Sequence, residues 1–215
     1  MGTRNLTCVY LDGKYGVAQY GQWDGYPAGQ GMTVLEFLKN EMNRETFIEK
    51  VRACRFINKE EREKLWIECG ANPQKNGVSM EESRIFEQKH PHLHRNTAAG
   101  VLKLIQDSEN GLPLNDELAF AGDSLFCEWC YVVDLDKNAF EVFKGWNKDP
   151  LQPDDRFCFL PVDGDEYKQV KLVASYSLDA LPSDDQFLKL DQDDDSLITD
   201  QLLHLATSVQ TDASI

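Results

Sequence analysis

The sequence predicts an α+β fold in which antiparallel sheets and helices form one domain over residues 1–182. Three observations carry this prediction: a hairpin pattern opens the chain, a second one follows residue 124, and helical patterns lie between them. The chain has 215 residues, of which 41% are hydrophobic and 10% aromatic, so it can build a sizeable core. Residues 183–215 are predicted to form an acidic, largely disordered tail, in which 196–206 has the pattern of a short amphipathic helix.

The first predicted element is a β-hairpin. Residues 5–11 alternate as a strand does, Asp12-Gly13-Lys14 is a turn signal, and residues 15–20 resume the β pattern. The chain then enters the segment Gly21–Gly31, which holds four glycines, a proline and two large aromatic side chains. Such a composition predicts a long loop.

Helical patterns follow this loop. Three of them begin after residues that favour the N-terminal cap, Thr33, Asn43 and Asn58. Another ends at the break His90-Pro91, and the last ends before Asn110-Gly111. The helices are expected at 34–40, 45–54, 59–69, 80–89 and 96–107.

Strand patterns return in the C-terminal part. Residues 125–134 and 139–144 flank the turn Asp136-Lys137-Asn138 and predict a second hairpin. Two further segments, 157–160 and 170–176, are predicted strands.

The charge of the chain excludes one class of partner. The net charge is −15, and the first 110 residues are balanced, with 15 basic and 15 acidic side chains. The remaining residues carry 7 basic and 22 acidic side chains and hold the whole imbalance. Nucleic-acid binding needs a basic face, so we expect none. The acidic excess either keeps the protein soluble or forms a surface or tail that engages a basic protein partner.

The chain gives no sign of membrane insertion or secretion. It has no stretch of about 18 uncharged apolar residues, and its first ten residues lack the basic and apolar regions of a secretion signal. A cytoplasmic protein with no membrane contact is therefore expected. The six cysteines lie in apolar surroundings, which favours buried, reduced thiols.

Two motifs raise the question of a metal. Cys127 and Cys130 form a CxxC pattern, but in a strand, side chains three positions apart point to opposite faces. His90, His92 and His94 lie within five residues, which a surface turn before a helix explains as well as a metal site does. No metal is predicted. Because phosphate loops and dinucleotide fingerprints are missing too, no cofactor is predicted.

The Gly21–Gly31 loop is the candidate binding site. Its glycines allow close approach of the main chain to another group, while Trp23 and Tyr26 supply a rigid surface and Asp24 a carboxylate. The alternative is a wide turn whose aromatic side chains fill the core.

Two resemblances add to this interpretation. The segments 17–27 (VAQYGQWDGYP) and 127–136 (CEWCYVVDLD) resemble a family of uncharacterised microbial proteins, a likeness that covers most of residues 1–182 and implies no activity. The order of elements also resembles the N-terminal-nucleophile hydrolases, whose fold is an αββα sandwich. Thr3, the Asp12-Gly13 turn, the acidic end at Asp24, the helices and the second hairpin follow the order of that family.

The hydrolase resemblance implies a nucleophile whose own α-amino group acts as the base. Thr3 would be that nucleophile, with Arg4 or Asp24 orienting it, although removal of Met1 exposes Gly2 and a further cleavage is needed to free Thr3. Two functions are therefore expected. The first is a noncatalytic binding protein that uses Trp23, Asp24 and Tyr26. The alternative is an amidohydrolase acting on a peptide-like or small amide-like ligand.

Overall fold

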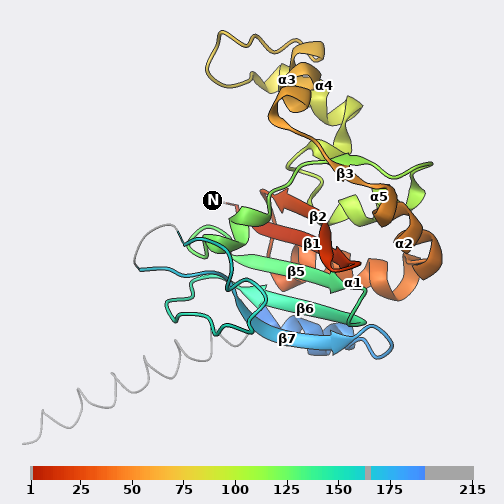
Figure 1. The fold of residues 1–215 in the computed structure, drawn as a ribbon, viewed down its shortest axis with the longest axis vertical. Coiled ribbons are helices and arrows are strands. Elements are labelled where there is room, and N and C mark those ends of the chain that lie inside the picture. Colours follow the sequence, from red (N-terminus) through yellow and green to blue (C-terminus); the bar gives the residue numbers. More distant parts are fainter. Residues whose placement is uncertain (1, 163–165, 192–215) are drawn as a thin grey trace, which may run out of the picture. The chain divides into compact units, whose positions relative to one another are not determined.

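The computed structural model describes residues 2–162 and 166–191 and confirms the α+β class (Figure 1). Its main sheet has five strands in the order β2-β1-β5-β6-β7. The strands are β1 (Asn5–Leu11), β2 (Lys14–Gly21), β5 (Trp129–Asp134), β6 (Ala139–Lys144) and β7 (Lys171–Ser177). Two residues each from β3 (Arg55–Phe56) and β4 (Pro113–Leu114) form a separate two-stranded sheet.

Both predicted hairpins are present. In the first, Asp12 and Gly13 have φ angles of 52° and 76°, the left-handed conformation that a tight turn between strands requires. The carboxylate of Asp136, in the turn of the second hairpin, accepts hydrogen bonds from the backbone N–H groups of both residues, at 2.9 and 2.8 Å. The two turns therefore stabilise each other at one end of the sheet.

The main sheet is mixed, which differs from the antiparallel arrangement expected from the sequence. β1 pairs with β5 in parallel, Asn5 opposite Trp129. Hairpin signals fix only pairings between strands close in sequence, so they could not reveal this long-range contact. Among the described residues, no second large sheet accompanies the first, as an αββα sandwich would require.

One strand prediction is wrong. Residues 157–160 form turns, whereas 171–177 form β7 close to the predicted position. Phe157 is fully buried in a core cluster with Cys8 and Cys130, and its ring lies 4.9 Å from that of Phe143. The apolar run therefore fills the space beneath the sheet without pairing in it.

The first helical region begins earlier than predicted. Continuous helical turns run from η1 (Pro27–Gly31) through α1 (Met32–Glu36) to η2 (Phe37–Glu41), η1 and η2 being π-helical. Thr33 is thus inside the helix and is not its cap. Pro27 is suited to a first helical turn because its φ is already helical and its missing N–H is not needed there. The irregular loop shrinks to residues 22–26.

Three further helices follow, and the first two have the caps predicted from the sequence. They are α2 (Arg44–Ala53), α3 (Lys59–Glu68) and α4 (Met80–Lys89). The Asn43 side chain caps α2, while Asn58 with Glu61 and Ser79 with Glu82 form reciprocal capping boxes at α3 and α4. Figure 1 shows α3 and α4 side by side.

The last predicted helix is shorter than its pattern. It consists of the 3-10 turn η4 (Ala98–Gly100) and α5 (Val101–Asp107). Ala98, the first residue of η4, has a φ of 43°, which lies outside the right-handed helical region, so no regular α-helix can run from Asn96 through this position. The buried side chains of Val101, Leu102 and Ile105 face the core as expected. Two more 3-10 turns, η3 (Pro91–Leu93) and η5 (Leu118–Gly122), complete the described elements.

The core lies on both faces of the sheet. On one face, Leu6, Cys8, Ala18, Cys130 and Val132 pack with Phe157 and neighbouring loops. The same face holds a buried charge cluster in which Arg156 forms ion pairs with Asp134 and Glu141. These pairs join the loop at 151–160 to β5 and β6.

The chain divides into two units, Met1–Leu181 and Pro182–Ile215. In the second unit, residues 184–191 are helical, and the Ser183 and Gln186 side chains exchange capping hydrogen bonds with each other's backbone N–H groups. Disorder was expected from the acidity of this segment. The predicted helix at 196–206 and the rest of the tail after 191 lie outside the described residues. None of the described helices is long and apolar enough to cross a bilayer.

Candidate functional site

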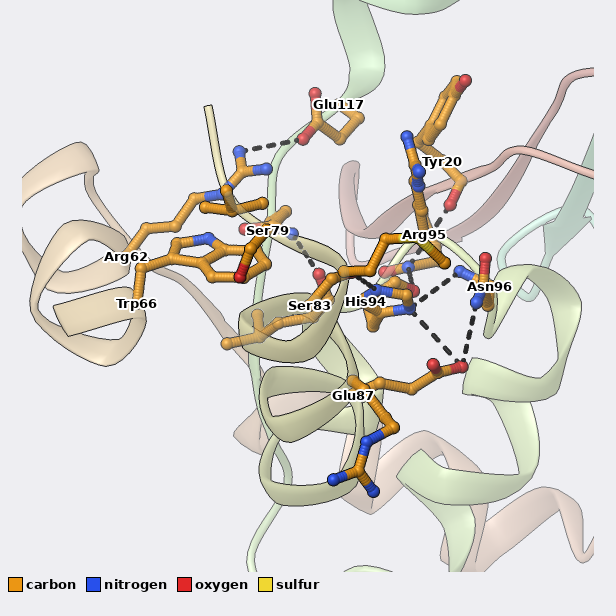
Figure 2. Close-up of a pocket in the computed structure, with 16 residues that line it drawn as sticks. Tyr20, Arg62, Trp66, Ser79, Ser83, Glu87, His94, Arg95, Asn96 and Glu117 are labelled. Atoms are coloured by element: carbon orange, nitrogen blue, oxygen red, sulfur yellow. Dashed lines mark hydrogen bonds and ion pairs between the residues drawn. The ribbon is translucent and has the colours of Figure 1, made fainter. Parts of the chain in front are cut away.

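A cavity of about 570 Å³ lies beside the edge strand β2 (Figure 2). Its walls come from α3, α4, the segment 93–96 and the segment 115–117, together with β2 itself. Its lining side chains include Gln19, Tyr20, Arg62, Trp66, Ser83, Arg84, Glu87, His94, Arg95, Asn96, Asn115 and Glu117.

Helix α4 and the turn after it bring three of these side chains together. Ser83 and Glu87 are four residues apart, so they lie on one face of α4. The helix ends at His90, where Pro91 prevents its continuation, and the 3-10 turn η3 folds the chain back. His94 therefore returns alongside the face that carries Ser83 and Glu87.

The geometry around His94 resembles a serine hydrolase triad. Its Nε2 lies 3.1 Å from Ser83 Oγ, and its Nδ1 lies 3.5 Å from Glu87 Oε1. The residue is only 4% exposed. A third group also meets the ring, because the backbone N–H of Asn96 donates to Nδ1 at 3.3 Å.

This third contact favours one tautomer of His94. A backbone N–H can only donate, so this bond, the shorter of the two contacts at Nδ1, requires a lone pair on Nδ1 and the ring proton on Nε2, whereas a bond from Nδ1 to Glu87 Oε1 would require the opposite tautomer. Burial lowers the pKa of His94, and nearby Arg95 acts in the same direction, while Glu87 opposes them. His94 is therefore neutral near pH 7 and donates from Nε2 to Ser83 Oγ. The Ser83 hydroxyl proton is free to donate to another acceptor.

Two buried amides hold this turn in place. Gln19 Nε2 donates to the carbonyl of His94 at 3.2 Å, and Asn115 Nδ2 donates to the carbonyl of Leu93 at 3.0 Å. The Oε1 atom of Gln19 is buried and has no hydrogen-bond partner among the described residues. The turn that forms this wall of the cavity is thus hydrogen-bonded to the edge strand β2 and to Asn115.

The charged side chains of the cavity differ in their partners. Arg62 pairs with Glu117 at 3.3 Å, and Arg84 pairs with Glu81 at 2.7 Å. Glu87 accepts a hydrogen bond from Asn96 Nδ2 at 3.1 Å. Arg95 is exposed and its guanidinium makes no hydrogen bond or ion pair with any residue that the structure describes.

The sequence-predicted site lies elsewhere, around the start of the chain. The backbone N–H of Gly25 donates to the carbonyl of Thr3 at 2.9 Å, and the buried Tyr131 hydroxyl donates to the carbonyl of Gly25 at 2.8 Å. Trp23 is 48% exposed, and its ring lies against Gly2. The structure thus brings Thr3 and the loop together through their backbones.

Two other predicted residues have local partners. The exposed Asp24 accepts a hydrogen bond from the Tyr26 hydroxyl at 3.3 Å and has a φ of 54°. Arg4 places its guanidinium over the Phe126 ring at 4.5 Å, and its backbone N–H donates to Glu128. No hydrogen bond or ion pair among the described residues joins the side chains of Thr3, Arg4 and Asp24. The cavity beside β2 is lined by none of the five predicted site residues, Thr3, Arg4, Trp23, Asp24 and Tyr26.

The cysteine and histidine motifs need correction. Cys127 and Cys130 lie in one core cluster and not on opposite faces, because β5 begins only at Trp129 and Cys127 belongs to the preceding turn. His94 is buried, so the interpretation of the histidine run as a surface turn is wrong for this residue. No group of three His, Cys, Asp or Glu side chains in the described part of the chain could hold a metal ion.

The site residues Ser83 and Glu87 escaped the sequence interpretation. Their spacing of four on a well-capped helix, with a histidine soon after the helix-ending proline, was the available signal. That pattern is common on solvent-exposed helices. It indicates a site here only because η3 folds the chain back and brings His94 against Ser83 and Glu87.

Comparisons with protein-family models, with curated proteins and with solved structures found no match for this chain. The two resemblances described for the sequence therefore stay predictions. The function has to be argued from the geometry of the cavity.

Proposed function

We propose that this protein binds a small molecule without catalysis, in the cavity between α3, α4 and the segment 93–96. The observation that carries this proposal is the Asn96 N–H bond to His94 Nδ1, which leaves Ser83 as a hydrogen-bond donor and not as an activated nucleophile. A noncatalytic binding protein is also what the sequence predicted, but there the contact surface was the Gly21–Gly31 loop and not this cavity. A contact surface on that loop stays a prediction.

The cavity has the general character of a ligand site. Its volume falls within the range of roughly 300–1,000 Å³ found for small-molecule pockets. Trp66 is stacked on Phe86 with ring centroids 3.8 Å apart, so its ring forms a fixed wall. Polar groups from β2, α4 and residues 94–96 converge on the same space.

A serine hydrolase is the second candidate, and the Ser83–His94 distance of 3.1 Å favours it. In such an enzyme, His94 must accept the Ser83 proton at Nε2 while Nδ1–H donates to Glu87. That requires the opposite tautomer and loss of the Asn96 bond. Incubation with a fluorophosphonate probe tests it, since covalent labelling that Ser83→Ala abolishes would establish an activated serine and overturn the noncatalytic proposal.

The binding function is tested by a thermal-shift screen with a fragment library. Ser83→Phe should fill the cavity and abolish the stabilisation by any fragment that binds there, since a bound ligand stabilises the folded state. Gln88→Phe is the matched control, because Gln88 is exposed on the same helix and does not line the cavity. Equal effects of the two variants on every fragment would contradict the proposal. Circular dichroism verifies that both variants fold.

The amidohydrolase hypothesis for Thr3 is tested separately. It requires a free amino group on Thr3, and therefore the loss of Met1 and Gly2 from the mature chain. Intact mass spectrometry of the purified protein gives the answer. Retention of Gly2 would remove Thr3 from consideration as a nucleophile.

A further inference from the structure

We infer that the ligand of this cavity carries an oxyanion, a carboxylate or a phosphate, that binds the guanidinium of Arg95 beside Tyr20. The inference deepens the proposed binding function and rests on it. It starts from the partners of the three arginines that line the cavity. Those of Arg62 and Arg84 are carboxylates, Glu117 and Glu81, whereas Arg95 has none among the described residues.

An unpaired guanidinium is informative in a protein with a net charge of −15. Carboxylates are abundant on such a chain, yet none of the described ones neutralises Arg95. Guanidinium groups present paired N–H donors that match the oxygens of carboxylates and phosphates. Arg95 is therefore the group in the cavity wall best suited to an external anion.

The hydroxyl beside Arg95 carries no charge. Burial, the largest effect, raises the pKa of Tyr20, while the charges of Arg4 and Arg95 lower it and that of Glu117 raises it. Tyr20 therefore stays a neutral hydroxyl and donates to Gln22 Oε1 at 2.7 Å.

The carboxylates of the cavity have partners other than Arg95. Glu117, whose charge also acts on Tyr20, pairs with Arg62, and Figure 2 shows Glu87 on the side of His94 away from Tyr20. Glu87 is also held by the Asn96 amide. An anion at Arg95 is therefore separated from Glu87 by the neutral His94 ring.

The remaining wall suits an apolar, flat body attached to the anion. Figure 2 places Trp66 and Arg62 on one side of the cavity, with Tyr20 and Arg95 on the other and Ser83 between them. A ligand anchored at Arg95 can extend past the Ser83 hydroxyl toward the fixed Trp66 ring. Aromatic acids and aryl phosphates share this chemistry.

Isothermal titration with three probes tests the inference: phenylacetate, phenyl phosphate and the neutral phenylacetamide. Both anions should bind at least about tenfold more tightly than the amide, since a hydrogen bond to a charged group contributes roughly 1.5–3 kcal/mol. The tighter of the two anions identifies which oxyanion the site prefers. In Arg95→Gln the preference over the amide should vanish, and in Arg95→Lys part of it should remain.

Arg55→Gln is the matched control, because Arg55 is an exposed arginine that is paired with Glu61 and does not line the cavity. Its affinities should stay within about twofold of the wild-type values. Equal binding of amide and anions, or an equal loss in Arg55→Gln and Arg95→Gln, would overturn the inference. Neutral fragments could bind, and lose their binding in Ser83→Phe, while no anion binds. In that case the binding function stands, and the inference that the ligand carries an oxyanion is wrong. If Ser83→Phe changes nothing, the binding function itself fails.

Discussion

Arg156 is a residue whose stability effect follows from its burial. Its side chain is 10% exposed and pairs with Asp134, which is fully buried, and with Glu141, which is 11% exposed. The exposed pair Arg52–Asp12 has the same chemistry with side chains that are 57% and 48% exposed. Because water screens the second pair and not the first, the two should respond differently to mutation.

We predict that Arg156→Met destabilises the protein by about 3–5 kcal/mol, since two buried carboxylates lose their counter-charge. Arg52→Met should change the free energy of unfolding by less than about 1 kcal/mol. Urea unfolding of the two variants measures both values. Similar losses in both would show that burial does not govern these ion pairs.

The histidines of the 90–94 segment predict a dependence of stability on pH. Burial lowers the pKa of both His92 and His94 below the ordinary value of 6.5. Between those lowered values and 6.5, the unfolded chain binds more protons than the folded one, so stability is complete above 6.5 and is lost as the pH falls. From about pH 7.5 to about pH 5.5, the free energy of unfolding should fall less in a His92→Gln/His94→Gln variant than in the wild type. Parallel pH profiles would contradict the burial effect.

Helices were the elements that the sequence predicted best. Asn43 and Asn58 cap α2 and α3 as predicted, because capping depends on residues within one turn of each other. The bounds of α4 also match the prediction, whereas its cap, Ser79, was not identified from the sequence. The start at Pro27 was missed because glycines at 29 and 31 favour a loop by propensity, whereas close packing around Gly29 requires a glycine at that position of the helix. A Cβ on Gly29 would lie 2.1 Å from the backbone oxygen of Asp24.

Gly29→Ala should therefore destabilise the protein by about 1–3 kcal/mol or more, since the clash is with backbone that cannot move aside cheaply. Gly13→Asn is the comparison. Gly13 has a φ of 76° but open space around its Cβ position, and Asn tolerates this conformation, so its effect should be within about 1 kcal/mol. Thermal unfolding distinguishes the two. A neutral Gly29→Ala would indicate that the 27–31 turn relaxes readily.

Ser79→Ala should weaken the helix that carries the cavity residues. Loss of the Ser79 cap costs about 1 kcal/mol, because the N–H of Glu82 loses its acceptor. Fraying at this end also loosens Ser83, so the affinity for phenyl phosphate should fall along with the unfolding midpoint. Asn58→Ala provides the comparison at the neighbouring helix α3, which has the same capping box. A loss of stability with unchanged affinity would show that the Ser79 cap does not influence ligand binding.

At the scale of the whole molecule, the sequence predicted the class of fold but neither the sheet order nor the site. Local patterns identified both hairpins, whereas the β1–β5 pairing joins residues 124 positions apart, Asn5 and Trp129, and leaves no mark in either strand. The cavity depends on the same kind of contact, since Gln19 of β2 holds the carbonyl of His94. The Trp23–Tyr26 loop was predicted as a binding site from its composition, and composition does not show which residues surround a loop in the fold.

The net charge of −15 predicts that salt stabilises the folded protein. Self-repulsion opposes the compact state, and raising NaCl from about 20 to about 500 mM shortens the screening length well below protein dimensions. The urea midpoint should rise over this range, because the exposed ion pairs that salt also weakens contribute little each. A falling midpoint would mean that those pairs outweigh the general repulsion.

The interior position of β1 in the sheet has a consequence for synthesis. When the first hairpin leaves the ribosome, one edge of β1 has no strand beside it until β5 has been translated. At roughly 5–20 residues per second, the wait for Trp129 is on the order of ten seconds. During that time the nascent chain presents an unpaired strand edge whose side chains are nearly all buried in the folded protein. Chaperones that recognise extended apolar segments should therefore bind the growing chain before residue 129 and release it once the meander of β5, β6 and β7 has emerged.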